Sequence, residues 1–451
     1  MKDVKRQEPI FFTKICGREI ELRRFYSGIN FLYNILSLRR NLRRKRSELV
    51  KLQEKKLRAI IRHAYQTVPF YHKLFKTHRI EPQAIRSVDD LWKLPMITKN
   101  DVQENFQNMI SKSVKISNCI RQRTSGSTGL PLTILKDKNA LDFQHAVSMR
   151  QFFECGGRLR DKVVQLRWTG AGAVPPDVKK SYYWNYFPQK NLWILADRLP
   201  LKDIIEILNS YNPDVIVSYP GLLKLVAEIP NLKIRPRLIF STAEILGKYV
   251  RTLIGESLGA RVIDSYGCVE AGDIAWECPY GYRGYHMNVD SVVIEFVKEG
   301  QNVAPGEDGE VVLTTLFNYA MPLIRYRIGD VASFSDERCP CGITLPLMSS
   351  LKGRCNDFIV LPDGRELPPW LFWNSIDLTG VAGFRIIQEK IGVIRVLLKV
   401  SKSYEKKQVE KTTRGLKRIF GDQVELKIDI VNELPRDSSG KMRSVISKVR
   451  S

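Results

Sequence analysis

The sequence predicts an α/β protein in which helices cover a parallel sheet, followed by a more antiparallel β subdomain and a small α+β domain. In the middle of the chain, short apolar runs alternate with segments of helical spacing, and the links between them are short. This alternation is typical of parallel strands joined by helices. From about residue 289, apolar runs are separated by Gly, Pro and Asp turns, which predicts antiparallel strands. Residues 357–451 read as strand, helix and strand, and therefore predict a compact α+β domain.

Helices are predicted first near the N-terminus. Residues 47–66 place their apolar side chains on one helical face, and Pro69 ends the pattern. A second helix is predicted over 140–154, because Gly156 and Gly157 stop it.

The central elements follow from the same reading of apolar runs and helical spacing. The predicted strands are 214–219, 237–241 and the strand that starts at 261–264, and the predicted helices between them are 221–229 and 245–258. In the C-terminal part, a helix near 405–419 is predicted between strands near 394–400 and 424–431.

The composition limits the classes of protein to consider. The chain has 451 residues, of which 43% are hydrophobic and 27% charged, so it can form two or three domains and is not disordered as a whole. Its 8 cysteines are too sparse for a secreted scaffold held by disulfides. The N-terminus lacks the apolar core of a signal peptide, and no apolar stretch is long enough to cross a membrane. We therefore expect a cytoplasmic protein.

The net charge of +24 is unusual and uneven. Residues 1–62 contain 18 Lys and Arg against 6 Asp and Glu, which is half of the excess. Within them, the uncharged segment 25–38 lies between arginine-rich flanks. We treat residues 1–46 as a basic N-terminal extension with two interpretations: its apolar segment packs on its own domain, or it contacts an anionic membrane as a peripheral anchor. Nucleic acid is not an expected partner, because no nucleic-acid-binding motif accompanies the charge.

A loop of small hydroxyl residues and glycines precedes Pro131. Such a loop lets backbone N–H groups and hydroxyls surround phosphate oxygens, although a flexible linker can have the same composition. It is not the P-loop of nucleotide hydrolases, because no Gly-Lys-Ser/Thr follows. The residues of the loop are Thr124, Ser125, Gly126, Ser127, Thr128 and Gly129.

Four further motifs lie downstream, each rich in glycine and in charged or hydroxyl side chains. They are Asp264–Glu270 (DSYGCVE), Arg325–Asp330 (RYRIGD), Gly353–Asp357 (GRCND) and Leu434–Lys441 (LPRDSSGK). Together with the loop before Pro131, their order and spacing resemble the adenylate-forming superfamily of acyl- and aryl-CoA ligases. The flanking segments 63–71, 94–99 and 339–342 are similar to the phenylacetate–CoA ligase branch, which includes the CapK-like proteins of capsular polysaccharide gene clusters. The resemblance covers most of the chain from about residue 50.

The resemblance implies the adenylate-forming ligase fold and a division into domains. A large ATP- and acyl-binding domain would span residues 47–356, and a small mobile domain would span 357–451. Asn356 and Asp357 would form the hinge between them, where relatives usually have a charged residue. Asn tolerates unusual backbone angles, which suits a hinge.

The resemblance also implies roles for individual residues. The loop residues 124–129 would hold the β- and γ-phosphates of ATP, and Glu270 would hold Mg²⁺ as a hard oxygen ligand. Lys441 would reach the carboxylate and the α-phosphate during adenylation, where two anions must approach each other. The remaining nucleotide-binding positions are Ala243, Glu244, Tyr266, Gly267, Asp330 and Arg354.

The implied activity is that of an AMP-forming carboxylate ligase that uses ATP, Mg²⁺ and CoA. It would join a carboxylic acid to AMP, release pyrophosphate and then transfer the acyl group, in most relatives to the thiol of CoA. Two alternatives stay open: transfer to an amine or hydroxyl group in surface polysaccharide assembly, and a non-catalytic homologue that binds adenylates or a membrane. The acid, the acceptor and the oligomeric state, monomer or dimer, are not determined by the sequence.

A second group of residues has the chemistry of a metal site. Cys278 and His286 flank a short loop, and Cys339 and Cys341 follow some way downstream. Three thiolates and one imidazole suit tetrahedral Zn²⁺, and a closed set of four ligands points to a structural role. Free thiols beside a surface histidine are the alternative.

Overall fold

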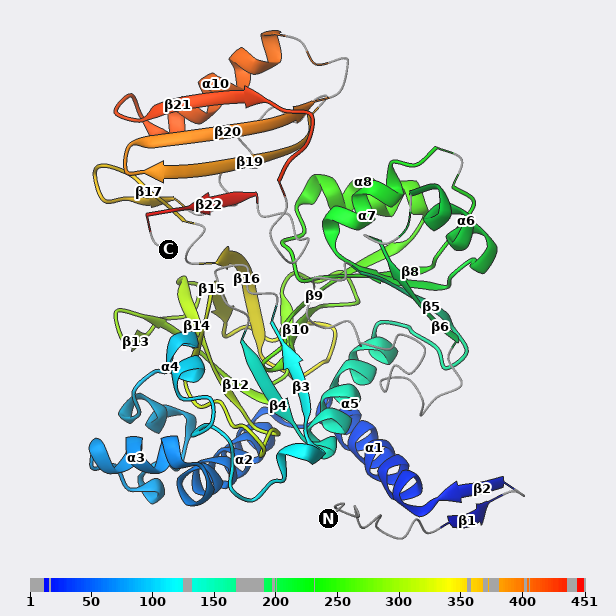
Figure 1. Cartoon of the computed structure of the whole chain (residues 1–451), viewed down its shortest axis with the longest axis vertical. Coiled ribbons are helices and arrows are strands. Elements are labelled where there is room, and N and C mark those ends of the chain that lie inside the picture. The colour runs from blue at the N-terminus through cyan, green and yellow to red at the C-terminus, as the bar shows by residue number, and fades with distance from the viewer. Residues whose placement is uncertain are drawn as a thin grey trace, which may run out of the picture.

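The computed structural model describes residues 12–15, 18–124, 132–167, 190–196, 199, 201–230, 232–354, 358–367, 372, 381–400, 404, 406–435 and 444–449. Its central feature is one twelve-stranded sheet (Figure 1). The parallel half, in spatial order, contains β6 (Lys190–Leu195), β5 (Lys162–Arg167), β7 (Val215–Ser218), β8 (Leu238–Thr242) and β9 (Arg261–Cys268). The predicted parallel strands at 214–219, 237–241 and 261–264 are confirmed.

The antiparallel half continues the same sheet from β9 onward. Its strands, in spatial order, are β10 (Gly272–Glu277), β11 (Tyr285–Met287), β16 (Leu347–Arg354), β15 (Tyr326–Ser335), β14 (Gly309–Thr315), β12 (Val292–Lys298) and β13 (Gln301–Asn302). The sequence placed the change of pattern near residue 289, but the chain already reverses at the turn between β9 and β10. The sequence did not reveal this reversal, because the turn at 269–271 has only three residues and none of them is glycine.

Helices cover the parallel half. The predicted helices at 221–229 and 245–258 are confirmed as α7 (Pro220–Ala227) and α8 (Lys248–Leu258), and α6 (Leu201–Tyr211) is a further helix that was not predicted. Their apolar faces bury Leu208, Leu223 and Ile254 against the strands. Helix α8 ends at Gly259, which adopts a left-handed conformation with φ of 62°.

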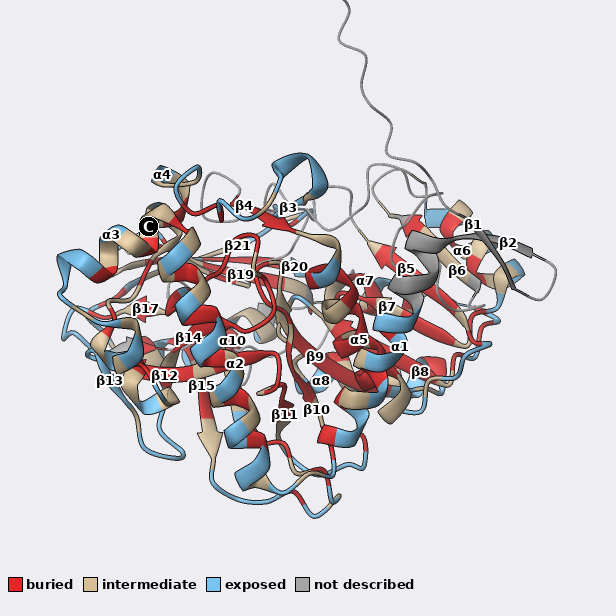
Figure 2. Cartoon of the chain, turned by 90° about the horizontal axis from the view of Figure 1, so that it is seen from below, coloured by how far each residue is buried: buried red, intermediate tan, exposed pale blue. Residues whose placement is uncertain are grey.

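The other face of the sheet carries the N-terminal helices. They are α1 (Leu22–Asn41), α2 (Arg46–Thr67), α3 (Pro69–Thr77), α4 (Lys99–Glu104) and α5 (Lys138–Glu154), with short 3₁₀ helices at Pro82–Ala84, Val88–Lys93 and Ile116–Asn118. Two small hairpins are formed by β1 (Phe12–Ile15) with β2 (Arg18–Glu21) and by β3 (Ile120–Arg123) with β4 (Thr133–Lys136). Two core clusters lie between these helices and the sheet, and buried residues are red in Figure 2.

Helix α1 is packed on the large domain rather than separate from it. Its residues Phe31, Ile35 and Leu38 join the same core cluster as side chains of α5. A buried ion pair holds this junction, because Arg150 lies 2.7 Å from Asp290, and Asn41 donates to the same carboxylate at 2.7 Å. Of the two interpretations of the apolar segment, packing on its own domain therefore holds for one face of the helix.

The C-terminal residues form a separate sheet and core (Figure 1). The spatial order is β21 (Glu425–Ile430), β20 (Val393–Val400), β19 (Val381–Lys390) and β22 (Val445–Ser447), with α10 (Lys406–Phe420) packed on it. The small pair β17 (Ile359–Val360) and β18 (Glu366–Leu367) contributes to this core. The predicted helix and strands of this unit are confirmed, and the unit lies beyond the Arg354 end of β16.

Candidate active site and Cys/His cluster

The hydroxyl- and glycine-rich loop leaves from a well-defined hairpin. The N–H of Thr124 donates to the carbonyl of Leu132 at 2.9 Å, and the N–H of Leu132 donates to the Thr124 hydroxyl at 2.9 Å. These two bonds hold the ends of the loop together at the tip of β3 and β4. The predicted phosphate-binding residues Ser125, Gly126, Ser127, Thr128 and Gly129 lie outside the described residues.

Glu270 lies in the turn between β9 and β10 and is nearly buried, with 8% of its surface exposed. The Tyr326 hydroxyl donates to its Oε1 at 3.2 Å. Lys136, at the end of β4, donates to the carbonyl of the preceding residue Val269 and to Gln144, each at 2.6 Å. The turn that carries the predicted Mg²⁺ ligand is thus held from two sides.

Lys136 was not identified from the sequence, since it is a single lysine at the end of a short apolar strand. It is fully buried, and burial lowers its pKa to about 8, although Cys268, Glu270 and Asp273 act in the opposite direction. A buried ammonium in hydrogen-bonding distance of a turn carbonyl fixes that turn and adds positive charge beneath it.

Tyr266 and Asp330 are brought together from distant parts of the chain. Tyr266 is on β9, and its hydroxyl donates to Asp330 Oδ2 on β15 at 2.8 Å. Asp330 in turn pairs in register with Arg354 on β16. The side chain of Arg354 lies outside the description, but its backbone places it beside Asp330.

Gly267 allows two backbones to approach closely. A Cβ at this position would lie 2.5 Å from the carbonyl oxygen of Gly272 on the neighbouring strand. Every side chain would therefore force β9 and β10 apart, next to the Glu270 turn. This explains why glycine follows Tyr266 in the motif.

Ala243 and Glu244 follow the carboxyl end of β8, which is where ligands bind in open α/β sheets. Thr242 pairs with Ser265, so Ala243 and Tyr266 follow at the same edge of neighbouring strands. Ala243 has a φ of 69°, a left-handed conformation that is uncommon for a residue with a side chain. Glu244 accepts a hydrogen bond from the backbone of Gly221 at the start of α7, at 3.0 Å.

The Arg325–Asp330 motif separates into structural and site residues. Arg325 is buried, forms an ion pair with Glu295 at 2.9 Å and donates to the carbonyl of Leu94 at 2.5 Å. Arg327 points outward and pairs with Glu310 at 2.6 Å. Tyr326 and Asp330 instead bond the site residues Glu270 and Tyr266. The sequence showed the motif but not this division, because it depends on which side of β15 each residue occupies.

Three more predicted positions cannot be placed. The hinge residues Asn356 and Asp357 and the lysine Lys441 lie outside the described residues.

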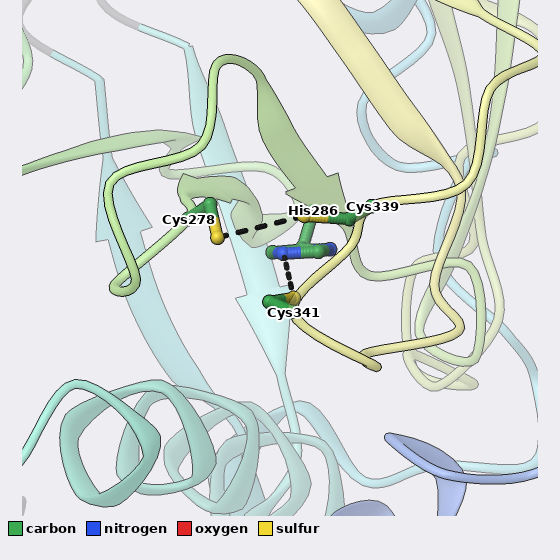
Figure 3. A group of neighbouring side chains, drawn as sticks. All are labelled: Cys278, His286, Cys339 and Cys341. Carbon is green, nitrogen blue, oxygen red and sulfur yellow. Dashed lines mark hydrogen bonds between the residues drawn. The ribbon is translucent and has the colours of Figure 1, made fainter.

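The four predicted metal ligands are close together (Figure 3). Cys278 follows β10, His286 lies on β11, and Cys339 and Cys341 lie between β15 and β16. Their ligand atoms all lie within 4.8 Å of one another. The sulfur atoms of Cys278 and Cys339 are 3.6 Å apart, and Cys341 Sγ is 3.4 Å from His286 Nε2.

These separations fit a tetrahedral ion. Zinc bonds of about 2.3 Å to sulfur and 2.0 Å to nitrogen place neighbouring ligand atoms about 3.5–3.8 Å apart. Cys278 and Cys339 are not joined by a disulfide. Burial lowers the pKa of His286 to about 4 and raises the pKa of Cys341 to about 12. The imidazole is therefore neutral, as a metal ligand would have to be, and the buried thiols need a cation nearby to become thiolates.

The two groups of residues lie at opposite ends of the same strands. Strand β10 runs from the Glu270 turn to Cys278, and β15 runs from Tyr326 and Asp330 toward Cys339. Strand β16 runs back from His286, whose partner is Leu347, to Arg354. Eight residues of extended strand separate the groups by roughly 20 Å. The cluster therefore does not contact groups bound at the Glu270 end.

The fold is similar to that of acyl-CoA ligases of known structure. The chain is similar over 91% of its length to 2-hydroxyisobutyryl-CoA ligase in the postadenylation state, with a TM-score of 0.76, 19% identity and 91% of that chain covered. It is also similar to O-succinylbenzoate coenzyme A synthetase from Bacillus subtilis in complex with ATP and magnesium, with a TM-score of 0.51 and 18% identity, covering 71% of this chain and 68% of that one.

Sequence relatives narrow this class. Residues 371–448 match the model of the CapK C-terminal domain. Protein CapK of Staphylococcus aureus is 25% identical over 433 residues, which cover 90% of this chain and 91% of that protein. Phenylacetate-coenzyme A ligase of Escherichia coli (strain K12) is 26% identical over 350 residues, which cover 72% and 75%. These findings confirm the resemblance to the adenylate-forming superfamily and to its CapK-like branch.

Proposed function

We propose that this protein is an AMP-forming acid–thiol ligase. A carboxylate oxygen attacks the α-phosphorus of ATP, the bond to the β-phosphate breaks, and pyrophosphate leaves. The thiol of CoA then attacks the acyl carbonyl, loses its proton, and AMP leaves with the electron pair of the broken acyl–phosphate bond. Phenylacetate-coenzyme A ligases among the relatives and a postadenylation CoA ligase among the similar structures support this reaction.

The observation that carries the proposal is the convergence of the motif residues at one end of the sheet. Tyr266 bonds Asp330, Tyr326 bonds Glu270, and Arg354 lies in register with Asp330. We propose that Glu270 holds Mg²⁺, that Asp330 accepts hydrogen bonds from the ribose hydroxyls and that Arg354 contacts the ribose or the α-phosphate. Mg²⁺ bound there would neutralise phosphate charge. Ala243, Glu244 and Gly267 would line the adenosine pocket at the same edge, and residues 124–129 would hold the departing phosphates.

Lys441 belongs to this proposal as the mobile cation. We propose that a domain of residues 357–451 rotates about Asn356 and Asp357, bringing Lys441 to the α-phosphate for adenylation and removing it for acyl transfer. Lys441→Ala should lower acid-dependent exchange of pyrophosphate into ATP by at least about 100-fold, since a positioned charge is lost from the transition state. The control Lys427→Ala removes an exposed lysine of the same domain, which pairs with Glu425 on its own strand, and should leave the exchange unchanged.

The deciding experiment is ATP–pyrophosphate exchange by the purified full chain with a panel of aromatic and aliphatic carboxylates, followed by an assay for CoA thioesters. Exchange with one acid and formation of its thioester are expected. Absence of exchange with every acid, in a folded protein that binds AMP, would show that the non-catalytic alternative is correct.

Transfer to an amine or a hydroxyl group is the second candidate. It is favoured by the match to the CapK C-terminal domain and by the relative CapK, which is similar over 90% of this chain. A role in capsular polysaccharide assembly would follow if the acceptor were a sugar. Exchange without consumption of CoA, together with acyl transfer to an amino sugar or a sugar hydroxyl, would favour this candidate.

We propose that Cys278, His286, Cys339 and Cys341 hold a structural Zn²⁺. The ion would supply the positive charge that thiolates at this buried position need, and it would tie the loop after β10 to the loop between β15 and β16. Elemental analysis of the protein, purified without chelator, should find about one zinc per chain.

We also propose that the protein works in the cytoplasm, where ATP and CoA are available, with peripheral contact to an anionic membrane. Among the residues that the structure describes, no helix combines the length and the apolar character that crossing a bilayer requires.

A further inference from the structure

Helix α1 presents a second apolar face that the core does not cover. Ile29, Leu32, Tyr33 and Leu36 are 47%, 52%, 69% and 57% exposed. Their spacing of three and four residues places them in one stripe along the helix, on the side away from Phe31, Ile35 and Leu38. We call these four residues the α1 stripe. Large apolar side chains gathered in this way are unusual on a protein surface and point to a surface that something covers.

The orientation of the α1 stripe is set by the rest of the domain. The opposite face of α1 is buried against α5, and the end of the helix is tied to the Arg150–Asp290 ion pair through Asn41. The backbone of Thr344, in the loop that carries Cys339 and Cys341, donates to the carbonyl of Leu42 at 2.9 Å. The stripe is therefore part of a rigid surface and not of a loose tail.

A row of cations lies on the next helix. Lys51, Lys55, Arg58 and Arg62 of α2 are all exposed, and their spacing places them along one side of that helix. We call these four residues the α2 row. Arg58 has Glu54 at 3.8 Å, which reduces but does not cancel the positive charge. Figure 2, seen from below, shows α1 and α2 on the near side of the molecule with exposed residues on both.

The charge of this face argues for an anionic partner. Residues 22–47 contain no Asp or Glu, and Arg40 follows Leu36 by one turn on the same side of α1. A second copy of the chain would bring an equally basic face against this one, with a net charge of +24 on each molecule. A bilayer with anionic headgroups offers both an apolar layer for the α1 stripe and negative charge for the cations.

We infer that the α1 stripe and the α2 row together form a docking face for an anionic lipid bilayer. The inference rests on the proposed membrane contact and not on the ligase chemistry. It places that contact on a folded surface formed by α1, which lies within residues 1–46, and by α2. Figure 1 places this face at the opposite end of the molecule from the C-terminal domain, so docking leaves that domain free to move.

The test is co-sedimentation of the full chain with vesicles of phosphatidylcholine alone and of phosphatidylcholine mixed with phosphatidylglycerol. The wild-type chain should bind the mixed vesicles and release them as salt rises. Leu32→Glu with Leu36→Glu should lower the partition coefficient at least about tenfold, because two apolar contacts are lost and two charges are repelled. Lys51→Gln with Lys55→Gln should lower it by roughly 25-fold, from about fivefold per cation.

A matched control is Leu201→Glu with Ile430→Glu, which changes two leucine-sized side chains that are 49% and 59% exposed on other elements. It should bind as the wild type does. Circular dichroism and thermal unfolding of each variant establish that it is folded. All the substituted side chains are exposed, so folding should be retained.

Three results overturn the inference in different ways. If the wild type does not bind mixed vesicles, both the membrane contact and this face are wrong. If the wild type binds but the Leu32→Glu, Leu36→Glu variant binds equally well, the contact stands and its assignment to this face is wrong. If the wild type is a dimer that does not bind vesicles, and this variant is a monomer, the face contacts a second copy of the chain. That result also overturns the inference. None of these results bears on the ligase proposal, which pyrophosphate exchange in solution tests separately.

Discussion

The two ends of strands β10, β15 and β16 have different chemistry. At one end are carboxylates and hydroxyls: Glu270 with Tyr326, and Asp330 with Tyr266. At the other end are three thiols and an imidazole within 4.8 Å of one another. Oxygen ligands prefer Mg²⁺ and leave room for phosphates and water, whereas a closed sulfur and nitrogen set prefers Zn²⁺.

The difference shows how one set of strands can carry a ligand-binding site at one end and a structural cluster at the other. We expect ligands to enter and leave the Glu270 end, where hydrogen bonds join side chains of neighbouring strands. The Cys/His end is buried, with His286 fully inaccessible, so it is suited to holding two loops in place. Substitutions at the first end should therefore change catalysis, and substitutions at the second should change stability.

The largest effect is expected for Glu270→Gln. The amide keeps the size of the side chain but removes the charge for Mg²⁺, so the rate of pyrophosphate exchange should fall by about 100-fold or more while the melting temperature stays the same. Glu310→Gln is the control, because Glu310 pairs with Arg327 on the outer side of the sheet. Exchange that survives Glu270→Gln would remove this residue from the site.

Cys339→Ser should act on the other end. Loss of one of four ligands should release the zinc, measured by elemental analysis, and lower the melting temperature by several degrees. Exchange by the folded variant should stay within about twofold of the wild type, because the cluster is roughly 20 Å from Glu270. The control Cys119→Ser changes a cysteine outside the cluster. If Cys339→Ser lowered pyrophosphate exchange as much as Glu270→Gln does, the two ends of the strands would be coupled.

Asp264 lies on β9 between the two ends, and its ionisation should make the stability of the protein depend on pH. Burial raises the pKa of Asp264 from 3.8 to about 6, and its carboxyl accepts from Tyr285 at 2.7 Å. A raised pKa means that the folded protein favours the protonated acid. The stabilising contribution is present below pH 4 and is lost as the pH rises to about 6, with a total of about 3 kcal/mol at 1.36 kcal/mol per unit.

The variant Asp264→Asn cannot ionise but still accepts the bond from Tyr285. Relative to the wild type, its free energy of unfolding should therefore increase between pH 4 and pH 6 and then stay constant. Denaturation by urea at several pH values measures this difference. The exposed control Asp422→Asn should show no such rise, and a parallel pH profile for wild type and Asp264→Asn would contradict the assignment.

The smallest effect compares two similar Tyr–Asp pairs. Tyr266→Phe removes a donor to Asp330. ATP binding should therefore weaken by about 1 kcal/mol, which raises KM for ATP roughly fivefold. Tyr285→Phe removes the matching donor to Asp264, which is not among the proposed nucleotide-binding residues, and should leave KM for ATP unchanged. Equal effects of the two substitutions would mean that Asp330 is not a selective part of the site.

Much of the fold could be predicted from local pattern. The helix at 47–66 and the strands at 214–219 and 237–241 follow from apolar spacing that packing then satisfies. The reversal after β9 was placed too late, because the direction of a strand depends on its partner and not on its own residues. For the same reason, the sequence could not show that the antiparallel strands extend the parallel sheet.

The candidate site divides in the same way. The Cys/His set was predictable because thiols and imidazole are rare in this chain, with 8 Cys and 5 His, and their chemistry is specific. Lys136 was not predictable, because one lysine among 72 Lys and Arg carries no sign of burial. Its role depends on the carbonyl of Val269, which is far away in the sequence.

The sequence by itself determined the kinds of element, their order and the chemistry that the motif residues can perform, since these depend on side-chain type and on spacing along the chain. Only the tertiary structure decided which of those residues meet. Tyr266 and Asp330, Cys278 and Cys339, and the two faces of α1 each depend on strand register and on the packing of one helix against another. Those contacts join residues far apart in the chain, so no local pattern records them.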